Sequence, residues 1–544
     1  MPVDRLRPSD LRGVRVHYVL EYVVASRTLY YSHAPLDIVW ADGTLIQVDA
    51  GLSSEIDWSE EMAFTGTSVP IRSVSVRLLD PQIDWSAMHA AGFDPAAGRC
   101  ELSQWVEGTT WDTRRLLVRG LPDRPVYAAQ GEELAFTLKA HPSQDRAVFP
   151  PATHIVDATT WPSASDEAAG VSYPQVFGHA GKGRIRYAGS IGVIVHVANK
   201  TLMVAGHDVE ASAVEVMDAA KLPSGTWVTL AVSQITDGRG VTVSVVTLPT
   251  AVSGDADFDE TATYAVSWGH STNGGGRYNR ERTGAMRDAG EVLEFLFNRS
   301  TMDVDRGRTA ATADLLRGRK LDFVVQEPTG VWDLISGRIL PALPVSIRNG
   351  PSGLYPVSWR QDVTSGQPRR RLSVARGEIA PVGSVVTEST LHGQLANEFR
   401  VAYCLDVAAG QTRGRFLLHG DPAITPDANT ATNRACRISR ARYTTARAGA
   451  QSTPAVMTVA TDVICDGATA SALAYDLATM HALPSRVVSY LVDREETALE
   501  EGTPVEITHA AWSLADAFGL IKSVSIQPDE SRLITVRLIE DAAR

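Results

Sequence analysis

The chain has 544 residues, of which 44% are hydrophobic and 21% are charged, and its formal net charge is −12 at pH 7. The length predicts about three to four structural units, and the composition is that of a globular protein rather than a disordered one. The negative charge argues against a protein that coats nucleic acid, because phosphate binding needs clustered lysine and arginine.

The cysteines and the N-terminus indicate the compartment in which the chain is expected to be synthesised. Cys100, Cys404, Cys436 and Cys465 are scattered, and no two of them have a metal-ligand spacing. We expect them to be small buried residues of a protein made in a reducing cytoplasm. The N-terminus has no apolar run after its charges, so no signal peptide is expected. No apolar stretch reaches the ~18 residues of a transmembrane helix, so no membrane-spanning segment is expected.

The first region, residues 1–150, is predicted to consist of short strands. Residues 14–20 and 69–79 alternate between apolar and polar side chains, which is typical of strands with one buried face. Residues 36–40 and 44–48 flank Ala-Asp-Gly at 41–43, a sequence that favours a β-hairpin. Short strands punctuated by turns indicate a barrel or a sandwich.

Residues 151–270 are predicted to form a second β unit, inserted between the first and the remaining regions. Strand-like runs occur at 193–197, 201–205 and 240–246. The polar, Gly- and Arg-rich stretch at 271–287 that follows is predicted to be an exposed loop or linker.

Residues 271–375 are predicted to be a linker followed by a mixed, partly helical region. Apolar residues recur with helical spacing at 288–297. Two further short helices are expected at 309–317 and 330–340, the latter ending before Pro341.

Residues 376–544 are predicted to be a second β region with one helix at 466–482. Asp466 is the expected N-cap of this helix, and Pro484 is expected to end it. Its apolar stripe consists of Leu473, Leu477 and Met480. Alternating strands follow around residues 487–493 and 505–509. The fold class expected for the whole chain is therefore α+β and predominantly β, with several domains.

Two glycine-rich segments are candidates for binding phosphate. Neither Gly181-Lys182-Gly183 nor the glycines at 274–276 match a phosphate-binding loop between a strand and a helix. We interpret both as ordinary turns, where glycine supplies a positive φ.

The histidines and paired acids do not form a recognisable catalytic motif. His196 and His207 lie in strand-like sequence without metal-ligand spacing, and structural roles are expected for them. A Ser–His–Asp triad stays open, because its members need not be close in sequence. Glu500 and Glu501 precede a turn glycine and are interpreted as a solvated turn. We therefore predict no catalytic, cofactor-binding or metal-binding residues, and no cofactor.

Two remaining clusters are interpreted as interaction features. The arginines at 369–371 are expected to form salt bridges at a protein interface, given the acidic chain. Four tryptophans fall in the first third of the chain, and their spacing does not indicate a sugar-binding site. They are Trp58, Trp85, Trp105 and Trp111.

The C-terminal third resembles the hub proteins at the baseplate or tail tip of long-tailed bacteriophages and related phage-like particles. The similar segments are a strand at 397–403, the helix sequence at 468–474, the Leu-Glu-Glu-Gly motif at 499–508 and the strand at 519–524. Residues 437–445 sit where that family has a short Ser-x-x-x-Tyr stretch. A further segment, Tyr-Pro-Gln-Val-Phe-Gly at 173–178, resembles the start of an inserted β domain in tail-tip proteins.

This resemblance implies a structural virion protein rather than an enzyme. Residues 1–150 and 376–544 would be two barrel-like hub domains, 151–270 the inserted domain and 271–375 the linker and mixed domain. Three copies would close a ring at the distal end of a non-contractile (siphophage) tail, after synthesis in the bacterial cytoplasm.

The same resemblance implies the partners. They would be the distal tail protein or tail tube, the tape measure protein and tip or fibre proteins, in a particle that attaches to the host and ejects DNA. DNA would pass through the lumen without specific binding. Two alternatives stay open from the residues alone: a tail-tip cell-wall hydrolase or esterase, with residues 150–270 as its site, and a carbohydrate-binding adhesin.

Overall fold

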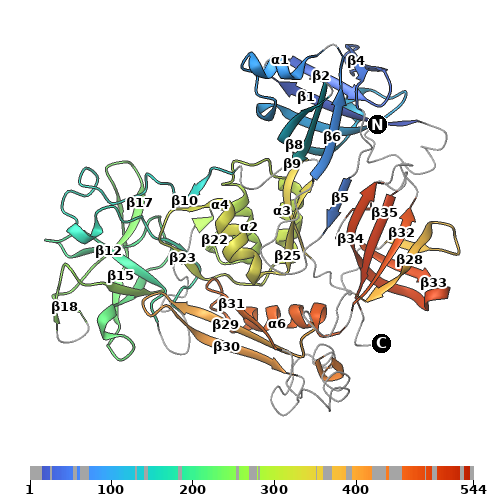
Figure 1. Cartoon of the computed structure of the whole chain (residues 1–544). Helices are drawn as coiled ribbons and strands as arrows, with labels where there is room; N and C mark the ends of the chain where they lie inside the picture. Colours follow the sequence, from blue (N-terminus) through green and yellow to red (C-terminus); the bar gives the residue numbers. More distant parts are fainter. Residues whose placement is uncertain are drawn as a thin grey trace.

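The computed structural model is predominantly β and divides into several sheets. Figure 1 shows the N- and C-terminal β regions on one side of a central helical region and a separate β unit on the other side. The structure describes residues 15–24, 27–52, 58–61, 73–81, 83–128, 132–139, 145–181, 187–252, 256–268, 278–279, 282–350, 352–358, 370–387, 395–419, 436–439, 456–483, 485–492, 499–500, 502–526 and 532–539.

The described part of the N-terminal region is a largely antiparallel sheet with the short helix α1. Its elements are β1 (Val16–Val24), β2 (Arg27–Ser32), β3 (Leu36–Val39), β4 (Leu45–Ala50), β6 (Ser73–Leu79), α1 (Trp85–Ala90), β7 (Arg99–Val106), β8 (Arg115–Ala128) and β9 (Glu133–Lys139). The strand order is β6-β9-β8-β7-β1-β2-β4-β3, and β2 with β4 is its parallel pair. The predicted hairpin is confirmed: β3 and β4 pair antiparallel across a turn in which Gly43 has φ +88°.

In the middle of β1 both faces are buried, because alternate residues there enter two different cores. Leu20 and Tyr22 join a large cluster, whereas Val19 joins a small one with Trp105 and Trp111. A strand that is buried on both faces has little freedom to slip in register.

The C-terminal sheet is built from strands at the end of the chain and is joined to the N-terminal sheet through one short strand. Its own strands are β27 (Arg370–Ser373), β28 (Ile379–Thr387), β32 (Arg486–Val492), β33 (Pro504–His509), β34 (Leu514–Ile526) and β35 (Arg532–Leu538). Strand β5 (Trp58–Glu61) pairs with β34 on one side and with the first residues of β6 on the other. A single sheet therefore runs from one end region to the other, as Figure 1 shows.

A shared hydrophobic core accompanies this shared sheet. Leu78 and Leu138 from the N-terminal region belong to the same buried cluster as Val488 and Ile534 from the C-terminal region. The two ends of the chain are thus held by apolar packing as well as by backbone hydrogen bonds.

The inserted unit is a closed barrel. Its strands are β12 (Ser190–His196), β13 (Thr201–Ala205), β14 (Ala213–Asp218), β15 (Val228–Ala231), β16 (Ser233–Thr236), β17 (Thr242–Thr247) and β20 (Tyr264–Ser267), with β18 (Ala251–Val252) and β19 (Ala256–Asp257) as a small hairpin. The order is β15-β14-β20-β12-β13-β17-β16. Strands β15 and β16 stand at opposite ends of this path, yet only Val232 separates them in the chain, so the sheet closes on itself. The strands predicted at 193–197, 201–205 and 240–246 are confirmed.

The central region contains the predicted helices. They are α2 (Ala289–Phe297), α3 (Arg306–Leu315) and α4 (Val331–Leu334), and α4 continues through a π-helical turn (Ile335–Ile339) and a 3-10 turn (Leu340–Ala342). Short strand pairs complete the region: β10 (Val148–Phe149) with β24 (Thr329–Gly330), β11 (Gln175–Phe177) with β23 (Phe323–Val325), and β25 (Val345–Gly350) with β26 (Gly353–Ser358).

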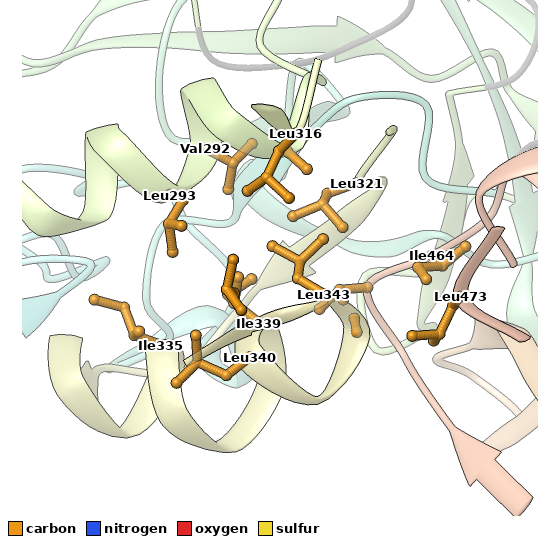
Figure 2. Close-up of a cluster of buried hydrophobic side chains, with 14 of the residues drawn as sticks. Val292, Leu293, Leu316, Leu321, Ile335, Ile339, Leu340, Leu343, Ile464 and Leu473 are labelled. Carbon is orange, nitrogen blue, oxygen red and sulfur yellow. The ribbon is translucent and has the colours of Figure 1, made fainter. Parts of the chain in front are cut away.

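The long helix α6 (Gly467–His481) packs on this central region together with β29 (Glu398–Asp406), β30 (Gln411–His419) and β31 (Val456–Ala460). Figure 2 shows Leu473 and Ile464 beside Leu343 in the same buried cluster as Val292 of α2. The predicted stripe is confirmed, since Leu473, Leu477 and Met480 are all buried. The predicted N-cap is also confirmed: Asp466 accepts the backbone N–H of Thr469 at 2.9 Å. Pro484 lies outside the described residues.

The prediction of a loop at 271–287 is wrong in part. Tyr278–Asn279 (β21) and Arg282–Ala285 (β22) form an antiparallel pair, and Met286 begins the approach to α2 as a buried residue. Backbone pairing between polar strands leaves no apolar alternation in the sequence, so the pattern could not reveal it. Residues 271–277 and 280–281 lie outside the described part.

Candidate functional site

The glycines and histidines that were candidates for binding phosphate or metal make contacts within the fold. Gly181 has φ +91° and packs against the backbone of Ser267, as expected for a turn glycine; residues 182–183 and 274–276 lie outside the described part. The Nε2 of buried His207 accepts the N–H of Val176 at 3.1 Å, and its Nδ1 lies 2.8 Å from the carbonyl of Asp208. His196 accepts the N–H of Asn199 at 3.1 Å in the β12–β13 turn. Both histidines thus make hydrogen bonds within the chain, as structural histidines do.

Three of the four N-terminal tryptophans are core residues. Trp85, Trp105 and Trp111 are all buried, and the guanidinium of Arg114 stacks 4.4 Å from the ring centre of Trp111. A buried ring cannot stack on a sugar. The side chain of Trp58 is outside the described part of the chain.

The described residues include neither a metal-binding cluster nor a membrane-crossing helix. No group of three or more His, Cys, Asp and Glu side chains there is arranged to hold a metal ion. No described helix combines the length and the apolar character needed to cross a bilayer.

The arginine run at 369–371 includes an ion pair within the chain, although the Arg371 side chain that forms it is 72% exposed. Arg371 lies in β27, which pairs in parallel with β33, and its Nε is 2.9 Å from the carboxylate of Glu506 in that neighbouring strand. Arg369 lies outside the described residues.

The interpretation of Glu500 as part of a solvated turn is wrong. Its carboxylate accepts hydrogen bonds from Arg308 at 2.7 Å and from Arg115 at 3.2 Å, and Tyr355 Oη lies 3.4 Å away. Arg348 is a third guanidinium, 3.9 Å from the same carboxylate. We call these five residues the Glu500 junction.

The Glu500 junction connects distant segments of the chain. Arg115 begins β8 of the N-terminal sheet, Arg308 lies in α3, Arg348 and Tyr355 lie on the β25–β26 hairpin, and Glu500 precedes β33 of the C-terminal sheet. Arg119 lies four residues after Arg115 in β8. It adds a second link by pairing with Asp303 at 3.0 Å. Three parts of the fold therefore meet on one carboxylate.

Local structure explains why Glu500 points inward. Gly502 adopts φ +71°, which glycine tolerates without strain. The turn is closed by Thr503, whose N–H donates to the Glu500 carbonyl at 3.0 Å and whose hydroxyl accepts the Glu500 N–H at 3.1 Å. Leu499 is buried immediately before it. The turn is thus real, as predicted, but it presents the carboxylate to the arginines rather than to solvent.

The charges of the junction determine the ionisation of Glu500. Burial by itself would raise the pKa of this carboxyl, but the positive charges of Arg308, Arg348 and Arg115 outweigh that effect, and the pKa falls to about 2. Glu500 therefore stays ionised over the physiological pH range. The junction contains no nucleophile activated by a base, so the chemistry it offers is electrostatic attachment between segments.

Comparison with known proteins gives distant structural neighbours. No family model and no curated protein matches the chain. Among solved structures, a tail protein from Neisseria meningitidis aligns over 96% of this chain and 97% of its own, with 10% identity and a TM-score of 0.37. A 43 kDa tail protein of prophage MuSo2 from Shewanella oneidensis aligns over 98% of this chain and 99% of its own, with 8% identity and a TM-score of 0.35.

A third neighbour, a PdpA–VgrG complex, aligns over 97% of this chain and 65% of its own, with 6% identity and a TM-score of 0.30. These TM-scores are too low to establish a shared fold, and we base no conclusion on them.

Proposed function

We propose that this chain is a structural protein of a phage tail, the hub at the distal end of the tail. Its role is to join the tail tube to the tip or receptor-binding proteins and to form part of the channel for the tape measure protein and DNA. The sequence resemblance motivates this proposal, and the segments that carry it form the expected kinds of element: strand β29, helix α6, and strands β33 and β34.

One observation carries the proposal: β5 joins the two end regions into one sheet. A hub subunit must hold two β domains at a fixed angle, so that both reach the ring that contacts the tube. A continuous sheet, a common apolar core and the Glu500 junction supply that rigidity. The inserted barrel lies on the opposite side of the central region (Figure 1). The rigid attachment of the two end regions therefore does not restrict movement of the barrel.

The proposed assembly is a homotrimer. Three subunits with two β regions each would present six similar positions to a six-fold tube, and a closed ring leaves no open interface. The net charge of −12 suits a channel in which DNA slides, because acidic walls repel phosphate instead of binding it. The inserted barrel would project outward, toward fibre or tip proteins.

The test is the mass and location of the full-length protein. Native mass spectrometry of the purified chain is expected to give three copies, and negative-stain images are expected to show a ring with a central hole. Antibody labelling of particles is expected at the distal end of the tail. A strict monomer at tens of micromolar would contradict the ring, and labelling elsewhere on the particle would contradict the hub position.

A further inference from the structure

Cys404 and Cys465 face each other although 61 residues separate them in the chain. Strands β29 and β31 run parallel, with Ala402 opposite Ala460. The contact continues beyond the strands, because the N–H of Cys404 donates to the carbonyl of Ile464 at 2.7 Å. The Sγ of Cys404 then lies 3.2 Å from the carbonyl oxygen of Cys465. The two segments are therefore hydrogen-bonded neighbours at these positions, which is the proximity that a bridge between the side chains requires.

The surroundings hold both thiols in place. Tyr187, which leads into the inserted barrel, donates its hydroxyl hydrogen to Cys465 Sγ at 2.8 Å. The Cys465 thiol donates to the carbonyl of Asp322 at 3.2 Å. Cys404 adopts φ +61°, a conformation that residues other than glycine rarely take, so its side-chain direction is imposed by the packing around it.

The two thiols differ in acidity. The hydrogen bond with Cys465 lowers the pKa of Cys404, whereas the same hydrogen bond raises that of Cys465, so Cys404 is the more readily ionised of the two. A thiolate is the form of cysteine that reacts with oxidants. Cys404 is only 4% exposed, so a small oxidant is needed to reach it.

We propose that Cys404 and Cys465 are an oxidation site that converts to an intramolecular disulfide with a peroxide as the oxidant. The Cys404 thiolate attacks one oxygen of hydrogen peroxide, forming a sulfenic acid and releasing hydroxide. The Cys465 sulfur then attacks the Cys404 sulfur, the S–S bond forms and the sulfenic oxygen leaves as water. Overall, two thiols lose two electrons and two protons, and one peroxide becomes two waters.

The disulfide would tie β29 to the segment that begins α6. Asp466, the N-cap of α6, follows Cys465 directly. The bridge would close a loop that runs from β29 through β30 and β31. It would also remove the thiol hydrogen that Cys465 donates to the carbonyl of Asp322. This modification is independent of any role in a phage tail.

Peptide mapping of the full-length protein tests the proposal directly. Trypsin places the four cysteines in separate peptides: Cys100 in 100–114, Cys404 in 401–413, Cys436 in 435–437 and Cys465 in 448–486. The native protein is treated with a few equivalents of hydrogen peroxide, alkylated and digested without reductant. We expect peptides 401–413 and 448–486 to appear joined, two hydrogens lighter than their sum, and to separate after treatment with dithiothreitol.

Variants separate the paired reaction from general oxidation. In Cys465→Ala the sulfenic acid on Cys404 has no partner, so a dimedone adduct on peptide 401–413 is expected instead of the cross-link. Cys100→Ala, whose thiol is buried in the N-terminal core, is the matched control and is expected to leave the cross-link yield unchanged. Recovery of both wild-type peptides fully alkylated, or of sulfinic and sulfonic acids without a joined peptide, would overturn the proposal.

Discussion

The carboxylate of Glu500 accepts a hydrogen bond of 2.7 Å from Arg308 across 192 residues of sequence. The turn before β33 of the C-terminal sheet is thereby fixed to helix α3 of the central region. Arg115 of the N-terminal sheet binds the other oxygen of the same carboxylate at 3.2 Å. Glu500 thus connects segments that are far apart in the sequence.

Replacement of Glu500 by glutamine is expected to destabilise the protein by about 2–3 kcal/mol. The loss leaves three guanidinium groups without their shared negative charge, and breaking a buried ion pair from one side is costly. The estimate is kept below the range for fully buried pairs because the Arg308 side chain is 43% exposed and partly screened by water. Urea unfolding monitored by tryptophan fluorescence measures the change.

A matched control is the exposed pair of Asp314 and Arg317 at the end of α3. Its side chains are 67% and 65% exposed, and its carboxylate–guanidinium distance is 2.5 Å, shorter than the 2.7 Å at the Glu500 junction. Asp314→Asn is expected to change stability by less than about 0.5 kcal/mol. If the two variants lose equal stability, burial is not what gives the Glu500 junction its strength.

The pH dependence of stability follows from the same carboxylate. Its pKa is near 4.5 in an unfolded chain and about 2 in the folded protein, so the unfolded state binds a proton first as the pH falls. The contribution of Glu500 is therefore fully present above pH 4.5 and is lost progressively as the pH falls toward 2. Comparison of the wild type with Glu500→Gln isolates this effect: their stability difference is expected to shrink across that interval. A difference that stays constant between pH 6 and pH 3 would contradict the lowered pKa.

The sequence predicts those features whose causes lie within a few residues. Asp466 caps α6 through the N–H of Thr469 only three residues on, and the stripe of Leu473 and Leu477 has the helical period. The hairpin at Gly43 is likewise set by the turn residues themselves. In each case the partner atoms are local, so residue type and spacing contain the information.

The sequence does not predict features whose partners are far away. The sequence predicts that Glu500 lies in a turn, and it does. The residues near it in the sequence give no indication that its partners are Arg115, Arg308 and Arg348. The pairing of β5 with β34 and the closure of the inserted barrel at Val232 also depend on long-range contacts. Strand partners are set by tertiary packing, and a strand's own pattern shows only which face is buried.

The cap of α6 provides a local test. Asp466→Ala removes the acceptor for both the N–H and the hydroxyl of Thr469, each at 2.9 Å. Loss of an N-cap costs about 1 kcal/mol, and that cost is expected here as a lower urea midpoint. Asp466→Asn keeps an amide oxygen in the capping position and is expected to retain most of the stability. Equal losses in the two variants would mean that the charge of Asp466, rather than the cap, is what matters.

The close approach of α2 to α3 depends on the absence of a side chain at Gly290. A Cβ placed there would lie 2.3 Å from the carbonyl oxygen of Ala313 and 2.7 Å from its Cα, both of them backbone atoms of α3. Gly290→Ala should therefore force the helices apart, at a cost of about 1–3 kcal/mol. Over most of that range the cost exceeds the gain of about 1 kcal/mol that alanine brings to a helix.

Gly337, in the π-helical turn, is the matched control, because a Cβ there would meet no atom within 4 Å. Gly337→Ala is expected to be neutral or stabilising, while Gly290→Ala lowers the urea midpoint. Hydrogen exchange of the α2 and α3 amides should rise in the Gly290 variant alone. If Gly290→Ala is as stable as the wild type, the two helices can separate without loss, and the packing between them is not what holds the central region together.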